Sequence, residues 1–92
     1  MSEADKARYY SQVLKALALL RGAAAEDGQL PGSAITIIER GLGVGTNRAK
    51  QICGALGRLG YRETLPGVNV SWVRIGTSVP SRQETDLEFG VR

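Results

Sequence analysis

The side chains best suited to specific chemistry in this chain are Asn47, Lys50 and Gln51, which fall on one face when the segment is drawn as a helix. Asn and Gln amides and cationic side chains match the hydrogen-bonding edges of base pairs in the major groove. An apolar run and a Gly-Val-Gly corner at Gly43–Gly45 precede them. This order predicts the turn and opening of a DNA-recognition helix.

A helical wheel started at Thr46 separates this polar face from an apolar one. Gly54 and Arg58 join the polar face, and Arg48 falls on its flank. The wheel places these residues on the apolar face: Ala49, Ile52, Cys53, Leu56 and Leu59. Such a division suits a helix that packs on its neighbours and leaves one side free to enter a groove.

Composition argues against an enzyme. The 92 residues contain no His and one Cys, so disulfides, His/Cys metal sites and histidine-based acid–base chemistry are excluded. The spacing of Cys53 among apolar residues predicts a small buried side chain rather than a nucleophile. We therefore expect no cofactor, no metal and no small-molecule substrate. We also expect no membrane partner, because no apolar run reaches bilayer-spanning length.

Charge is unevenly distributed along the chain, although the formal net charge is only +3. Between Gly45 and Ile75 five cations accompany one anion, Glu63. The cations are Arg48, Lys50, Arg58, Arg62 and Arg74. This bias is expected of a surface that faces phosphates, and a solvated face with a chance excess of charge is the alternative.

Three helices are predicted from apolar periodicity and capping residues. They cover about residues 3–21, 34–41 and 46–59. Ser2 (with Asp5), Ser33 and Thr46 are the expected N-caps, and Gly60 is expected in the left-handed conformation after the third helix.

The first helix has an unusually broad apolar stripe. Its expected core positions are Ala7, Tyr10, Val13, Leu14, Leu17 and Ala18. Tyr9, Ala16 and Leu20 widen the stripe. The sequence leaves three explanations open: a broad core face, a homodimer interface, or a seat for the C-terminal tail.

Residues 61–75 change to a strand pattern around Pro66-Gly67, which predicts a hairpin with a two-residue type II turn. The expected pairs are Leu65 with Val68, Glu63 with Val70, and Tyr61 with Trp72. We expect the apolar face that these pairs form to cover the helices, with Trp72 as a core anchor. The opposite, solvent-facing side is then polar: Arg62, Thr64, Asn69 and Ser71.

The order of elements predicts an α+β, mainly α fold: a winged helix-turn-helix of three helices followed by a β-hairpin wing. The domain is expected to cover residues 1–76. Residues 77–92 are expected to form a mobile C-terminal tail, although Ser81 to Glu84 also fit the cap of a short helix.

Residues 39–52, followed by Leu56 and Leu59-Gly60, resemble the C-terminal gamma domain of FtsK-type DNA translocases. The hallmark of that domain is a stretch of the kind Gln-Arg-x-Leu-x-Ile-Gly-Tyr-Asn-Arg-Ala. The resemblance implies a winged helix that reads a short oriented duplex sequence through Asn47 and Arg48, with Lys50 and Gln51 carried over less directly. This chain departs from the pattern at Glu39 and Thr46, so a different target sequence is expected.

These patterns together predict a cytoplasmic, sequence-specific double-stranded DNA-binding protein, either a small transcriptional regulator or an accessory factor. Homodimerisation through the first helix is expected. The predicted DNA-binding residues are Thr46, Asn47, Arg48, Lys50, Gln51, Arg58, Arg62, Asn69 and Arg74. A winged-helix protein–protein interaction module without DNA affinity is the alternative.

Overall fold

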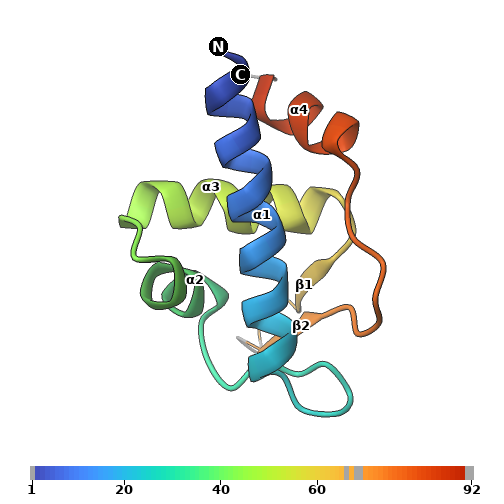
Figure 1. Ribbon diagram of the computed structural model, residues 1–92. Helices are drawn as coiled ribbons and strands as arrows, with labels where there is room; N and C mark the ends of the chain where they lie inside the picture. The colour runs from blue at the N-terminus through green and yellow to red at the C-terminus, as the bar shows by residue number, and fades with distance from the viewer. Residues whose placement is uncertain (1, 66, 68–69, 91–92) are drawn as a thin grey trace.

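The computed structural model describes residues 2–65, 67 and 70–90, and it is mainly helical with one small antiparallel hairpin (Figure 1). The elements in the described part of the chain are α1 (Glu3–Ala23), α2 (Ala34–Leu42), α3 (Thr46–Arg58), β1 (Arg62–Leu65), β2 (Val70–Val73) and α4 (Arg82–Gly90). The α+β, mainly α prediction is therefore confirmed.

Helix α1 crosses in front of α3, and α2 packs against both (Figure 1). The core lies where these three helices meet and is closed at one side by Tyr61 and Val73. Its largest fully buried aliphatic side chains come from all three helices: Val13, Leu17, Leu20, Ile38, Ile52 and Leu56. Among the described residues, no helix combines the length and apolarity that crossing a bilayer requires.

Helix α1 begins as predicted, because the Ser2 hydroxyl accepts a hydrogen bond from the Asp5 amide at 3.1 Å. Its buried stripe differs from the predicted one. The buried residues are Tyr9, Val13, Ala16, Leu17 and Leu20, whereas Ala7 and Ala18 are exposed. The prediction was wrong about which side of the apolar stripe faces the core. Helices α2 and α3 both pack on the side of α1 that carries Tyr9, whereas α4 covers part of the opposite side.

The hairpin pairs differently from the prediction. Leu65 opposes Val70 and Glu63 opposes Trp72, a register two residues away from the one expected. A two-residue turn at Pro66-Gly67 is wrong because it does not fit this register. Pro66 lies outside the described residues, and Gly67 has φ of +82°.

The predicted faces of the hairpin are also reversed. Val73 is buried, and Arg62, its partner on β1, points toward α3 and donates to the Cys53 carbonyl. Glu63 and Leu65 are exposed, and Trp72 is half-buried outside the core. Val73, at the end of β2 nearest the core, sets which face of the hairpin points inward. Cross-strand partners share a face, so the burial of Val73 also turns Arg62 toward the helices.

A short segment before α2 lies along the free edge of β2. The Leu30 amide donates to the Ser71 carbonyl and the Val73 amide donates to the Gly28 carbonyl, both at 2.9 Å. Gly28 has φ of +91°, and a Cβ there would overlap the Val73 carbonyl oxygen. Glycine is therefore required where this segment meets the strand.

The expectation of a mobile tail over residues 77–92 is wrong for residues 82–90, which form α4 beside the first half of α1 (Figure 1). Ser81 and Glu84 form a reciprocal capping box, with hydrogen bonds of 3.1 and 2.8 Å. Pro80 and Thr85 are buried, and the Tyr10 hydroxyl donates to the Pro80 carbonyl at 3.2 Å. The tail therefore covers part of the broad face of α1.

Candidate nucleic-acid interface

A three-residue corner links α2 to α3. Helix α2 ends at Leu42, and its C-cap is Gly43, whose φ of +67° is left-handed and whose amide donates to the Glu39 carbonyl. Gly45, in extended conformation, is the N-cap of α3 and makes no side-chain cap. The prediction of Thr46 as N-cap was therefore wrong. Its hydroxyl instead donates to the Glu39 carboxylate of α2.

The exposed face of α3 carries the residues that the wheel assigned to it. Asn47 and Lys50 are exposed, and Gln51 and Gly54 are half-buried. The opposite face is buried: Ala49, Ile52, Cys53, Ala55 and Leu56. The polar–apolar division predicted for this helix is confirmed, with Ala55 as an additional core residue and Leu59 only partly buried.

Cys53 belongs to this packed face, and its thiol is buried as predicted. Burial raises the pKa of the Cys53 thiol above its ordinary value, and the nearby Arg62 guanidinium offsets only part of that rise. The thiol therefore stays protonated at neutral pH, as a core side chain rather than a nucleophile.

The flanking cation Arg48 is half-buried and lies over the Tyr9 ring of α1, 5.6 Å from its centroid. This contact holds the guanidinium at the edge of the exposed face. Lys50 has no hydrogen bond or ion pair with any residue that the structure describes. It is therefore an exposed, unpaired charge at the middle of the face.

Arg58 ends α3 and pairs with Glu88 of α4. The Arg58 side chain is 57% exposed and that of Glu88 is 20% exposed. Sequence reasoning missed this pair because it expected a mobile tail and did not place the possible short helix after Ser81 against α3. A carboxylate now neutralises one of the five cations that were expected to face phosphates.

Arg62 is likewise engaged inside the protein. Its Nε donates to the Cys53 carbonyl at 3.0 Å and its Nη1 donates to the Thr64 hydroxyl at 2.8 Å. Its guanidinium lies so close to Gly57 that a Cβ there would come within 2.9 Å of Nη2. The expectation of an outward-facing Arg62 on the hairpin is therefore wrong, because the reversed faces turn it toward the end of α3.

Two further residues near the hairpin, Arg74 and Asn69, were predicted to contact DNA. The Arg74 guanidinium stacks on the Tyr61 ring, 4.4 Å from its centroid, and the Arg74 carbonyl accepts from Arg21 Nε at 2.8 Å. Asn69 lies outside the described residues. The structure thus brings Thr46, Asn47, Lys50 and Gln51 together on one face and leaves Arg58, Arg62 and Arg74 in other contacts.

Comparison with protein-family models, with curated proteins and with solved structures found no match to this chain. Among the described residues, no group of three or more acidic or cysteine side chains is arranged to hold a metal ion.

Proposed function

We propose that this protein binds double-stranded DNA by placing the exposed face of α3 in the major groove. In this proposal α1 to α3 form a winged helix-turn-helix and the β1–β2 hairpin is its wing. The role that follows is a small transcriptional regulator or an accessory DNA-binding protein.

The observation that carries the proposal is the face of α3 itself. Asn47, Lys50 and Gln51 project from a helix whose other side is anchored in the core, beyond a three-residue turn from α2. Asn and Gln amides pair with adenine edges, and a Lys ammonium pairs with guanine or with phosphate. A rigid helix supports such contacts better than a loop does.

Because several of the five cations already contact other protein groups, we propose that fewer than five of them contact DNA. Lys50 and Arg48 lie on or beside the exposed face of α3 and are proposed as the principal phosphate contacts. Arg58 and Arg62 already have protein partners. We therefore assign Arg62 to the support of α3 rather than to the wing contact.

Glu39 and Thr46 bear on the proposed relationship to the FtsK gamma domain. The two positions at which this chain departs from that pattern are hydrogen-bonded to each other across the turn. This hydrogen bond supports a similar turn with a different surface beside Asn47. We infer a target sequence that differs from the one read by the translocases.

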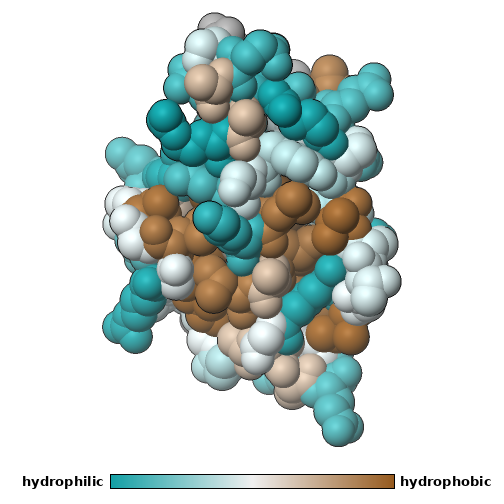
Figure 2. Space-filling model, viewed as in Figure 1, coloured by the Kyte–Doolittle hydropathy of each residue, from teal (hydrophilic) through white to brown (hydrophobic). Residues whose placement is uncertain are grey.

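We also propose a homodimer. A shallow apolar groove of about 650 Å³ runs between α1 and α2, lined by Ala18, Leu19, Ile37 and Leu42 among others. Figure 2, seen from the α1 side, shows a broad apolar area at the middle of this face. Two-fold dimers of helix-turn-helix proteins bind half-sites about one helical turn apart. A monomeric mass by light scattering, both free and on DNA, would exclude this dimer.

The same groove supports one second candidate, a protein-interaction module that uses the helical frame without DNA. Exposed apolar surface of this kind commonly marks a binding face. A partner that stays bound after nuclease treatment, together with the absence of DNA affinity, would favour this function over the first.

In vitro selection of bound duplexes from a random pool tests the proposed function. We expect enrichment of one short motif, as a single copy or as two half-sites, which would also reveal the symmetry of binding. A matched selection with an Asn47→Ala, Gln51→Ala variant should lose or change that motif. Failure of the native protein to enrich any sequence would exclude sequence-specific binding.

A further inference from the structure

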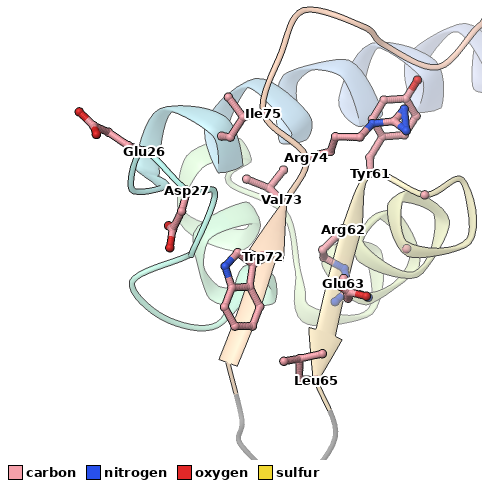
Figure 3. A pocket seen from close by; sticks show the side chains of 12 residues that line it. Glu26, Asp27, Tyr61, Arg62, Glu63, Leu65, Trp72, Val73, Arg74 and Ile75 are labelled. Atoms are coloured by element: carbon pink, nitrogen blue, oxygen red, sulfur yellow. The ribbon is translucent and has the colours of Figure 1, made fainter.

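An open cleft of about 800 Å³ lies beside the hairpin (Figure 3). The hairpin, the end of α3 and the loop at Glu26-Asp27 surround it. This volume falls within the range of small-molecule sites, about 300–1,000 Å³. The DNA-binding proposal uses neither this cleft nor the side chains on its floor.

The floor of the cleft is apolar. Trp72 lies on β2, between the segment around Gln29 and strand β1, and it is half-buried. Leu65, 41% exposed, leaves the same face of the hairpin as Trp72, and Ile75, 50% exposed, lines the cleft beyond Val73 (Figure 3). The indole N–H donates to no residue in the described part of the chain. An indole, two exposed aliphatic side chains and a free donor together form a floor suited to an organic ligand.

Carboxylates surround the tryptophan. Glu63 directly opposes Trp72 across the hairpin, so their side chains leave the sheet on the same face. Asp27 lies across Trp72 from Glu63, and a hydrogen bond of 3.0 Å from the Gln29 amide holds its carboxylate (Figure 3). Glu26 adds a third charge at the rim. Within the described residues none of the three carboxylates has an ion-pair partner.

The cations that line the cleft are directed away from Trp72. Arg62 leaves the opposite face of β1 and donates to the Cys53 carbonyl. Arg74 lies over the Tyr61 ring at the far end of the cleft (Figure 3). The cleft therefore has an acidic end with an indole floor, while Arg74 lies at its other end and Arg62 is turned toward α3.

We propose that this cleft is a binding site for a small organic cation with an apolar or aromatic body. The cationic group lies over the Trp72 indole between Glu63 and Asp27, and the apolar body covers Leu65 on the same face of the hairpin. Attraction between a cation and an indole face is strong for this ring type and increases when the cation is desolvated. The carboxylates add Coulombic attraction and exclude anions of the same shape.

Trp72 is the single tryptophan of the chain, so its fluorescence reports binding directly and without DNA. We expect benzyltrimethylammonium to quench it saturably. The neutral isostere neopentylbenzene should bind about tenfold more weakly, because it lacks the cation–indole and Coulombic attractions. Glu63→Gln should weaken binding of the cation severalfold. Glu3→Gln, a matched change outside the cleft, should leave binding unchanged.

Several results would overturn the proposal. They are the absence of saturable quenching, equal affinity for the neutral compound, and equal affinity of the Glu63→Gln variant. Circular dichroism checks that each variant is folded. Titration calorimetry measures binding of the cation to the Trp72→Leu variant, which lacks the fluorescent side chain. Undiminished binding by that variant would place the site elsewhere. DNA affinity enters none of these measurements, so a failure here leaves the proposed function standing.

Discussion

The two ends of α3 use polar residues in opposite ways. At its first two turns Asn47 and Lys50 project into solvent, and within the described part of the chain their side chains make no ion pair or hydrogen bond. At its last turn Arg58 pairs with Glu88, and Arg62 from the adjoining strand packs on Gly57 and donates to Cys53. The first end is open to a ligand, and the second is joined to the rest of the protein.

The difference shows that the number of cations in a segment does not define a phosphate-facing surface. Five cations lie between Gly45 and Ile75, and four of them contact a carboxylate, a backbone carbonyl or an aromatic ring. An arginine is suited to such contacts because its planar guanidinium donates in several directions and stacks on rings. A lysine without a partner keeps its charge for a ligand.

The largest effect is expected from the buried side of α3. Ile52→Ala removes a fully buried side chain and should lower the free energy of unfolding by about 2–5 kcal/mol. Lys50→Ala, two residues earlier on the exposed side, should change it by less than about 0.5 kcal/mol. Urea denaturation followed by Trp72 fluorescence measures both, and equal losses would contradict the division of the helix into two faces.

Removal of Arg62 should cost stability rather than DNA affinity. Arg62→Ala leaves the Cys53 carbonyl and the Thr64 hydroxyl without this donor, which should lower the free energy of unfolding by about 1–2 kcal/mol. Arg40→Ala, at an exposed arginine of α2, is the control and should be nearly neutral. If Arg62→Ala were as stable as the control yet bound DNA poorly, Arg62 would belong to the DNA interface after all.

The two glycines of α3 provide a finer comparison. Gly54→Ala should stabilise the protein by up to about 1 kcal/mol, because alanine favours a helix and the exposed Arg58 side chain can move aside. Gly57→Ala should gain nothing or lose stability, because its Cβ would displace the engaged Arg62 guanidinium. Thermal unfolding of the two variants measures the difference, and an equal gain would show that Arg62 is not held in place.

The smallest effect is expected from the ion pair at the end of α3. Glu88→Gln removes the charge that pairs with Arg58, and partly exposed pairs contribute about 0–1 kcal/mol. The loss should shrink as salt is raised, since screening already weakens the pair. Thermal unfolding at low and high salt measures it. A loss several times larger, independent of salt, would mean that Glu88 anchors α4 through packing rather than through charge.

Local signals in the sequence predicted most of the helical part. Ser2 and Ser33 cap the helices that they were expected to cap, and Gly60 adopts the left-handed conformation with φ of +87°. The exposed and buried sides of α3 followed from helical periodicity alone. Such features depend on residues within one or two turns of each other, so a single sequence contains them.

The errors involve contacts between distant segments. The orientation of the hairpin depends on Val73 entering a core built by three helices. The role of Arg58 depends on a helix thirty residues later, whose Ser81-Glu84 cap was visible in the sequence but whose packing on α1 was not. Neither capping nor periodicity specifies which partner a face will meet, so these contacts needed the structure.

The most direct test of the central claim is fluorescence anisotropy of a labelled duplex titrated with the protein at several salt concentrations. Native protein should bind with an affinity that falls steeply as salt rises, as counterion release requires. Lys50→Ala should weaken binding and reduce the salt slope by about one, whereas Arg58→Ala should leave the slope nearly unchanged. The absence of salt-dependent binding to any duplex, or equal losses from both variants, would contradict the assignment of the open end of α3 as the DNA-binding surface.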